Sequence, residues 1–223
     1  MVINNNMYTR SKGVFNPENQ KYNIKVFGIG SIGSMVTLGL SKLGFSDLTA
    51  FDYDKIELPN ISNQFYRISD LGKFKVDALH DIVKDFSGID INIRNKKITA
   101  QNAPELISDI NMNTLVVLAF DNLEARKLVY DIVKDFPLKL MDLRMGGVGW
   151  EQYVVDLSND EEKAAFEKTL SQKTVDLPCG EQSICFNIFN IASEACNTIV
   201  KINNNLPYKK LLKRSMDSYY FIG

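Results

Sequence analysis

The sequence predicts an α/β fold: a mostly parallel, twisted sheet with helices on both faces, formed as a single domain. Strand-like and helix-like segments alternate along most of the chain, which is the order expected of parallel strands joined by crossover helices. A chain of 223 residues with 45% apolar content can bury one sizeable core. No repeat, low-complexity tract or interdomain linker divides it.

The spacing of apolar residues places the elements in order. Residues 23–29, NIKVFGI, are a short apolar run closed by glycine and predict the first strand, and residues 31–44 predict a helix with a glycine stop. Further strands are expected over 47–52, 91–98, 113–120 and 138–143, with an edge strand over 150–157. Further helices are expected over 71–86, 122–136, 159–170 and 183–202, and KKLLKR at 209–214 as a solvated helix face.

Composition narrows the class of protein. The 26 Lys and Arg residues nearly cancel the 27 Asp and Glu residues, so no global field favours nucleic acid or an anionic membrane as a partner. No apolar run reaches the roughly 18 residues that span a bilayer, and the polar start MVINNNMYTR does not resemble a signal peptide. The 3 cysteines lack C-x-x-C spacing, which indicates a reducing compartment and no zinc site. We expect a soluble cytoplasmic protein.

A glycine-rich turn follows the first predicted strand. Gly28, Gly30 and Gly33 form G-x-G-x-x-G between strand and helix, and Asp52 ends the next strand. Such glycines let a phosphate approach backbone N–H groups at the helix N-terminus, and the acid can accept hydrogen bonds from ribose hydroxyls. The pattern predicts a nucleotide site in preference to simple close packing of helix on strand. It does not say which nucleotide.

The loop after Asp52 is unlike that of a dehydrogenase. A dehydrogenase normally runs on to a helix soon after its ribose acid, whereas residues 51–75 form a long polar stretch. Cations near its end suit a triphosphate better than hydride transfer, because the negative charge that develops there must be neutralised. Asp121, just beyond the strand at 113–120, supplies an oxygen ligand for Mg²⁺. The polar and charged side chains of the stretch include Asp54, Asn60, Asn63, Gln64, Arg67, Lys73 and Lys75.

Four motifs in one order carry a family resemblance. They are G-x-G-x-x-G, D-x-D-x-I-E-x-x-N, D-x-G-x-x-K and F-D-N-x-x-A-R, and together they resemble the ThiF/MoeB/HesA adenylating enzymes, which share their core with the ubiquitin-activating enzymes. The resemblance covers residues 8 to about 202, and it is strongest to short ThiF-like proteins of bacteria and phages. It implies one Rossmann-like domain with an N-terminal arm (1–22), a nucleotide-binding core (23–157), a crossover loop with C-terminal helices (158–202) and a tail (203–223).

The resemblance also implies roles for individual residues at a site for ATP and Mg²⁺. The three glycines match the phosphate turn, and Asp52 matches the acid that holds the ribose. Lys75 matches the lysine that contacts the phosphates in the adenylation transition state. Asp121 resembles the Mg²⁺-binding aspartate, and Asn60 the asparagine that faces the nucleotide.

Two further roles concern partners. Arg10 resembles an N-terminal arginine that the family lends across a homodimer interface to the γ-phosphate, and Cys179 lies where some relatives place a thiol that receives the activated acyl group. The implied function is ATP-dependent adenylation of the C-terminal carboxylate of a small ubiquitin-like or sulfur-carrier protein ending in Gly-Gly. Whether the product is a thiocarboxylate, a thioester or another adduct stays open, as does the reactivity of Cys179.

The chain departs from the family pattern at one position of the nucleotide site. The family usually has Arg-Gln where this chain has Asn63-Gln64, which removes one phosphate-binding charge. Arg67, about one helical turn further on, is a candidate replacement and is counted with Asn63 and Gln64 among the nucleotide-binding residues. The paired C-x-x-C zinc motifs of many relatives are also absent.

Two other functions stay open. One is an NAD-dependent oxidoreductase, which DLGKFK and the lack of a hydride-transfer acid other than His80 disfavour. The other is a non-catalytic nucleotide-binding scaffold, which the missing arginine favours. His80 itself is expected to be structural or on the surface, and Cys185 and Cys196 to be packing residues. Arg144 either meets the partner's carboxylate or caps a strand.

Overall fold

A seven-stranded sheet with strand order β3-β2-β1-β4-β5-β6-β7 forms the centre of the molecule. This computed structural model describes residues 5–147, 149–171 and 185–215. Five neighbouring strands pair in parallel, in the order β3, β2, β1, β4 and β5, whereas β6 and β7 pair antiparallel at one side of the sheet. The strands are β1 (Asn23–Phe27), β2 (Leu48–Phe51), β3 (Asn92–Arg94), β4 (Thr114–Leu118), β5 (Lys139–Gly146), β6 (Gly149–Asp156) and β7 (Leu211–Ser215).

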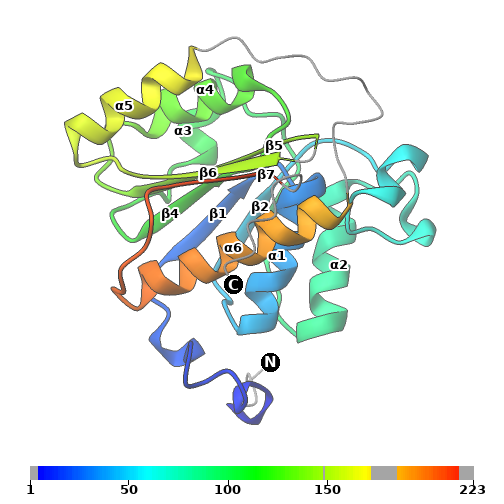
Figure 1. The fold of residues 1–223 in the computed structure, drawn as a ribbon. Coiled ribbons are helices and arrows are strands. Elements are labelled where there is room, and N and C mark those ends of the chain that lie inside the picture. The colour runs from blue at the N-terminus through cyan, green and yellow to red at the C-terminus, as the bar shows by residue number, and fades with distance from the viewer. Residues whose placement is uncertain (1–4, 148, 172–184, 216–223) are drawn as a thin grey trace.

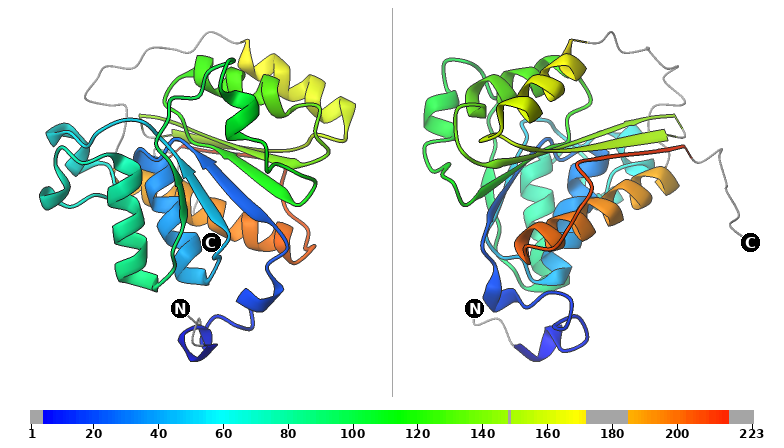
Figure 2. Two further views of the ribbon diagram at one scale, coloured as in Figure 1. Left: turned by 180° about the vertical axis from the view of Figure 1, so that it is seen from behind. Right: turned by 60° about the vertical axis from the view of Figure 1, so that its left-hand side comes forward.

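Helices cover both faces of this sheet, as the sequence predicts (Figures 1 and 2). One face carries α1 (Ser31–Leu43), α2 (Lys75–Ser87) and α6 (Cys185–Asn203), and the other carries α3 (Ala103–Leu106), α4 (Leu123–Val133) and α5 (Asp160–Leu170). Each face has its own apolar core, because successive side chains of a strand point to opposite faces. Met141 and Leu143 of β5 belong to the first core, and Leu138 and Leu140 to the second.

The structure differs from three of the sequence predictions for the elements. The strand expected over 91–98 is short, because only Asn92–Arg94 pair with β2. The stretch 209–214 is not a helix face: residues 211–215 form β7, which pairs with β6, so β6 is not an edge strand. A two-residue apolar pair among lysines fits a helix or a strand equally well, and the pairing partner decides. Helix α2 begins at Lys75 rather than at residue 71. The residues just before it are used by an antiparallel bridge between Lys55 and Phe74.

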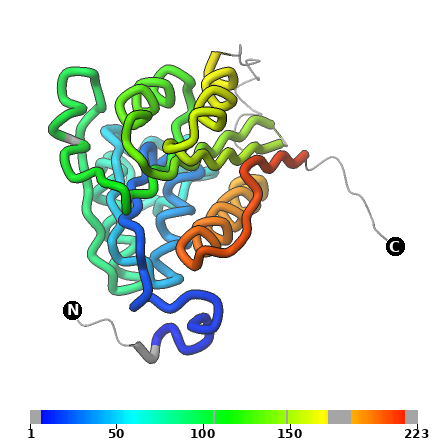
Figure 3. Tube along the Cα trace, turned by 90° about the vertical axis from the view of Figure 1, so that its left-hand side faces the viewer, coloured from blue at the N-terminus to red at the C-terminus, as the bar shows by residue number. Residues whose placement is uncertain are grey.

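The N-terminal arm packs at the end of the sheet where β1 begins (Figure 3). Phe15 is buried and stacks on Phe45, with ring centroids 3.9 Å apart. A Cβ on Gly44, which ends α1, would lie 2.4 Å from Pro17 Cγ and 3.0 Å from Tyr8 Cε1, so the arm lies against the C-terminal end of that helix. The arm is therefore anchored at the opposite end of α1 from the glycine turn.

Among the helices that the structure describes, none combines the length and the apolar content needed to cross a bilayer.

Candidate functional site

The glycine turn between β1 and α1 is shaped by backbone contacts that side chains would disrupt. Gly28 has a φ of 83°, and a Cβ there would lie 3.0 Å from the carbonyl oxygen of Ala119. A Cβ on Gly33 would lie 1.9 Å from the carbonyl oxygen of Gly28, so only glycine lets α1 approach the turn this closely. Gly30 differs, because the nearest atom to a Cβ there is Gln64 Nε2 at 3.7 Å. The turn is thus closed against β4 and α1 and has space at Gly30.

Asp52 is tied directly to this turn. Its Oδ2 accepts a hydrogen bond from the Ile29 N–H at 3.0 Å, and its Oδ1 accepts one from the Asp54 N–H at 2.9 Å. Burial raises the pKa of Asp52, while nearby Lys75 and the two backbone donors act against that rise. The carboxylate is therefore held in place beside the turn, with lone pairs left for hydroxyl donors of a ligand.

Lys75, the first residue of α2, brings a cation to the same place. Its side chain is 9% exposed, and its Nζ lies 3.1 Å from Asp54 Oδ2. The backbone N–H of Lys75 also donates to the Asp54 carbonyl at 2.9 Å, which fixes the start of the helix. The structure therefore brings the glycine turn, Asp52 and Lys75 together, as the sequence predicts.

The segment 63–66 lies against the turn and leaves two acceptors unsatisfied. Tyr66 Oη donates to the Ile29 carbonyl at 2.6 Å, and the Phe65 N–H donates to Ser34 Oγ at 3.1 Å. Asn63 Oδ1 and Gln64 Oε1 are buried and have no hydrogen-bond partner among the residues that the structure describes. Buried acceptors of this kind are normally paired, so they fit a bound group with N–H or O–H donors. A nucleotide has such groups on its base and ribose.

Asn60 has a local role in the structure. Its Oδ1 accepts a hydrogen bond from the Glu57 N–H at 3.0 Å, within the capping box of the short helix η3 (Leu58–Ser62). Its side-chain oxygen is therefore already used by the loop.

Asp121 is exposed and lies just beyond the C-terminal end of β4. A buried network of ion pairs holds the preceding residue, Phe120, in place. Arg126 donates to the Phe120 carbonyl and to Asp142, whose side chain has no exposed surface. Arg144 Nε donates to the other oxygen of Asp142 at 2.7 Å, and its Nη2 donates to Thr169 Oγ1 at 2.8 Å. Arg144 thus braces β5 against the last turn of α5. Arg126 is the final residue of F-D-N-x-x-A-R, and the motif alone does not predict its place in this network.

The donor set for a metal is sparse. Of the residues described, no group of three or more His, Cys, Asp or Glu side chains is placed to hold a metal ion. Mg²⁺ usually takes one or two carboxylates and completes its shell with water and substrate phosphates. Asp121 fits that mode only as one ligand among several.

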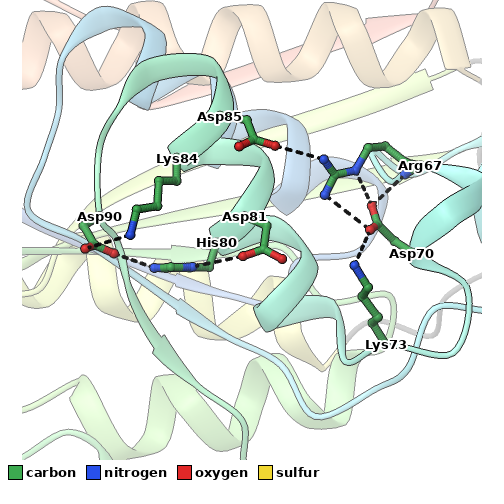
Figure 4. Close-up of polar contacts among 8 residues, drawn as sticks. All are labelled: Arg67, Asp70, Lys73, His80, Asp81, Lys84, Asp85 and Asp90. Carbon is green, nitrogen blue, oxygen red and sulfur yellow. Dashed lines mark hydrogen bonds and ion pairs between the residues drawn. The ribbon is translucent and has the colours of Figure 1, made fainter.

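Arg67 pairs with two carboxylates, in a cluster that also contains Lys73 (Figure 4). Its Nε is 2.8 Å from Asp70 Oδ2 and its Nη1 is 3.0 Å from Asp85 Oδ2, while Lys73 Nζ is 3.0 Å from Asp70 Oδ1. Burial alone would raise the pKa of Asp70, but hydrogen bonds from Arg67 and Lys73 outweigh it, so the pKa lies below its ordinary value. The structure does not bring the Arg67 guanidinium to the glycine turn.

The remaining candidates lie outside the turn region. His80 pairs with Asp90 at 2.5 Å on the exposed side of α2, in agreement with a surface role (Figure 4). Arg10 is exposed on the N-terminal arm. Cys196 is buried as expected, but Cys185 is exposed, so the packing role predicted for it is wrong. Cys179 lies outside the described residues.

A cavity that sequence reasoning missed lies along the antiparallel strands. It has a volume of about 460 Å³ and is lined by residues of β5, β6 and β7, among them Arg144, Trp150, Glu151 and Lys213. These side chains lie where β5 ends and β6 begins, at the edge of the sheet that also holds the glycine turn. No sequence motif indicates this cavity, because the pairing of β7 with β6 creates one of its walls.

Comparisons of sequence find curated relatives that this chain matches in part. "Ubiquitin-like modifier-activating enzyme 5" of Caenorhabditis elegans is 30% identical over 144 residues, which is 57% of this chain and 34% of that protein. "NEDD8-activating enzyme E1 catalytic subunit" of Arabidopsis thaliana is 32% identical over 115 residues, 51% of this chain and 24% of that protein. The matched regions span only about a quarter to a third of the length of these relatives.

Comparison of structures gives the same fold at lower identity. The structure of E. coli MccB with selenomethionine MccA has a TM-score of 0.74 at 14% identity, covering 97% of this chain and 70% of that one. E. coli tRNA N6-threonylcarbamoyladenosine dehydratase, TcdA, in complex with AMP, has a TM-score of 0.71 at 16% identity, covering 92% of this chain and 98% of that one. The ThiF family pattern matches residues 17–212, nearly the whole chain. The protein whose glycine turn, Asp52 and Lys75 converge at one edge of the sheet belongs to the ThiF family.

Proposed function

We propose that this protein transfers AMP from ATP to the C-terminal carboxylate of a small ubiquitin-like or sulfur-carrier protein with a Gly-Gly terminus. The observation that carries the proposal is the convergence of Asp52 and Lys75 at the glycine turn: the turn and Asp52 are bridged by the Ile29 N–H at 3.0 Å, and Lys75 Nζ lies 3.1 Å from Asp54. Membership of the ThiF family and the partial match to ubiquitin-like activating enzymes support it. The AMP and ATP complexes of structural neighbours support the choice of nucleotide.

The chemistry requires positioning more than covalent catalysis. A carboxylate oxygen of the carrier attacks the α-phosphorus of ATP, the bond from that phosphorus to the bridging oxygen breaks, and pyrophosphate leaves. The product is an acyl-adenylate. In this proposal Asp52 accepts hydrogen bonds from the ribose hydroxyls, the glycine turn holds phosphate oxygens, and Lys75 neutralises negative charge as it develops. The open oxygens of Asn63 and Gln64 accept hydrogen bonds from the nucleotide.

Asp121 is proposed as the protein ligand of a magnesium ion. A divalent ion at this position would offset phosphate charge, as in other phosphoryl-transfer sites. The network of Arg126 and Asp142 fixes the Phe120 carbonyl and therefore the chain direction at Asp121.

Arg10 is proposed to act on a second copy of the chain in a homodimer. In its own subunit the arm packs at the C-terminal end of α1, and a helix of 13 residues separates that end from the glycine turn. At 1.5 Å per residue this is about 20 Å, too far for an arginine side chain to cover. A role for Arg10 at the phosphates therefore requires a partner subunit. Cys179 is kept as a proposed acceptor thiol for a second step.

A non-catalytic nucleotide-binding scaffold is the second candidate. One observation favours it: the family arginine is replaced by Asn63, and Arg67 is paired with Asp70 and Asp85 instead of facing the turn. Of the two predicted phosphate-binding cations Arg67 and Lys75, Lys75 then remains the one beside the turn. Such a scaffold would bind ATP and would not activate a carboxylate.

Pyrophosphate exchange separates the two candidates. The protein is incubated with ATP, Mg²⁺, labelled pyrophosphate and candidate small proteins ending in Gly-Gly, taken first from genes beside its own. We expect label to enter ATP only when the right carrier is present, and not with a carrier that lacks its last glycine. ATP binding without exchange for any such carrier would favour the scaffold. A second assay uses Cys179→Ser, which should retain exchange while any thiol-linked carrier disappears from a non-reducing gel.

A further inference from the structure

Two backbone hydrogen bonds, next to an antiparallel bridge, join the two ends of the loop between β2 and α2. The Ile56 N–H donates to the Lys73 carbonyl at 2.9 Å, and the Gly72 N–H donates back to the Ile56 carbonyl at 2.9 Å. The excursion between these contacts, residues 57–71, therefore leaves the sheet edge and returns to it. It carries Asn63 and Gln64 toward the glycine turn on the way out and leads into Lys75 on the way back.

One buried carboxylate holds the returning half of this loop. Asp70 has no exposed side-chain surface, and it accepts hydrogen bonds from Arg67 Nε at 2.8 Å, the Arg67 N–H at 3.1 Å and Lys73 Nζ at 3.0 Å. Arg67 then continues to Asp85 on α2 at 3.0 Å. We name Arg67, Asp70, Lys73 and Asp85 the Asp70 clamp; Figure 4 shows Arg67 lying between its two carboxylates.

The direction of the Arg67 side chain is set by its far partner. Asp85 lies ten residues after Lys75 on the same helix, α2 (Lys75–Ser87). At 1.5 Å per residue, the two residues are about 15 Å apart along the axis. The guanidinium is thus oriented along α2 and away from the end that carries Lys75.

We infer that Asp70 is a positioning residue of the nucleotide site, and that Arg67 serves this clamp instead of replacing the phosphate-binding arginine missing at Asn63. The Asp70 clamp fixes residues 67–73 against α2. The clamp thereby sets the position of Lys75 and of the neighbouring segment 63–66, which contacts the glycine turn through Tyr66. The inference rests on the proposed function, because that function supplies the nucleotide that Lys75 and the side-chain amides of residues 63 and 64 would contact.

The test is a double-mutant cycle on ATP affinity, measured by isothermal titration with Mg²⁺ and the full chain. Asp70→Asn and Arg67→Ala should each weaken ATP binding about tenfold, which corresponds to the loss of one charge-assisted hydrogen bond. Because both substitutions act through one clamp, the double variant should bind ATP as tightly as the single variant that has the lower ATP affinity. If Arg67 contacts phosphate independently of Asp70, the two losses multiply and the inference is wrong.

Adenosine serves as the second probe, since it lacks the phosphates that Lys75 would meet. We expect both variants to lose less affinity for adenosine than for ATP, because adenosine can meet the 63–64 amides and Asp52 but not Lys75; a general loss of folded protein would lower both affinities equally. The matched control is Asp90→Asn, which removes an exposed carboxylate that pairs with His80 and Lys84 and does not belong to the clamp; its ATP affinity should stay within about twofold of wild type.

Two outcomes would require different conclusions. If the wild-type protein binds ATP no better than adenosine, the proposed function fails whatever the variants do. Arg67→Lys keeps the charge but cannot span both carboxylates. If wild type prefers ATP and Arg67→Lys retains full ATP affinity, the clamp is not needed and the inference fails.

If Asp70→Asn does not melt cooperatively, Arg67→Gln replaces it in a cycle with Lys73→Gln, since both side chains are partly exposed. Non-additive ATP losses would again support the clamp, and multiplied losses would again overturn it.

Discussion

Lys75 is the side chain on which the proposed chemistry depends most. It is almost fully buried, next to Asp54 at 3.1 Å, and close enough to Asp52 to affect the pKa of that acid. A buried ammonium needs such partners, because desolvation would otherwise disfavour its charged form. The motif D-x-G-x-x-K located Lys75 from sequence alone. The motif did not reveal that Asp70 of the same motif holds the loop in place, because that depends on where Arg67 and Lys73 fold.

Replacing Lys75 should slow adenylation more than it weakens ATP binding. Lys75→Ala removes a fixed positive charge where the phosphates gain negative charge, and a loss of about 3 kcal/mol there is a roughly hundredfold slower exchange. Contacts from the turn and Asp52 remain, so ATP affinity should fall less. Lys84→Ala is the control, since Lys84 lies on the same helix and pairs with exposed Asp90. Equal rates for Lys75→Ala and Lys84→Ala would remove Lys75 from the mechanism.

The two described cysteines should differ in reactivity. Burial raises the pKa of the Cys196 thiol to about 12, so at pH 8 almost none of it is thiolate, the reactive form. Cys185 is exposed at the start of α6. Iodoacetamide at pH 8 should therefore label Cys185 in the native protein and label Cys196 only after denaturation, as followed by peptide mass spectrometry. Equally fast labelling of both in folded protein would contradict the buried position of Cys196.

At the scale of elements, apolar periodicity predicted most strands and helices because burial on a sheet face or a helix stripe imposes it. It failed where long-range pairing decides. The strand β7 exists because its residues pair with β6, as Trp150 does with Arg214, and nothing local in KKLLKR indicates this. Likewise α2 starts at Lys75 because the Lys75 N–H is taken by the Asp54 carbonyl, a contact across 21 residues of chain.

Two glycines of the turn should respond differently to alanine. A Cβ on Gly33 would meet the Gly28 carbonyl oxygen at 1.9 Å, so Gly33→Ala must displace α1 from β1 and should lower stability by several kcal/mol, on the order of other overpacked or strained sites. A Cβ on Gly30 meets nothing closer than 3.7 Å. Gly30→Ala should therefore melt within a few degrees of wild type and lose nucleotide affinity. Chemical denaturation and ATP titration of both variants test this, and equal stability loss would mean that the turn is not closed as described.

At the scale of the whole molecule, the sheet separates the arm from the site. The arm is anchored by Phe15 and Tyr8 near the end of α1, while the site residues gather at the carboxyl ends of β1, β2 and β4. That gathering is a general property of parallel α/β sheets, which is why the sequence could predict it. The position of Arg10 relative to another subunit could not be predicted, since it depends on a surface and not on a motif.

Subunit mixing tests whether Arg10 acts across a dimer. In a mixture of Arg10→Ala and Lys75→Ala subunits, a mixed dimer has one site with Lys75 from one chain and Arg10 from the other. Random exchange should restore about a quarter of wild-type exchange activity, because half of the dimers have one intact site. Each variant alone should show only a small fraction of wild-type exchange activity, and light scattering should give a dimer. A mixture that regains nothing, or a fully active monomer, would rule out this arrangement.

The central claim is that the edge formed by the glycine turn, Asp52 and Lys75 is a site for ATP, and nucleotide titration tests it without any carrier. ATP with Mg²⁺ and NAD are titrated separately into the same wild-type preparation. Asp52→Asn serves as the variant that should weaken ATP binding, because the neutral amide is a poorer acceptor for ribose hydroxyls than the carboxylate held by the Ile29 N–H. The account predicts tighter binding of ATP than of NAD and a loss of ATP affinity in Asp52→Asn. Tighter binding of NAD, or no binding of ATP at all, would contradict it.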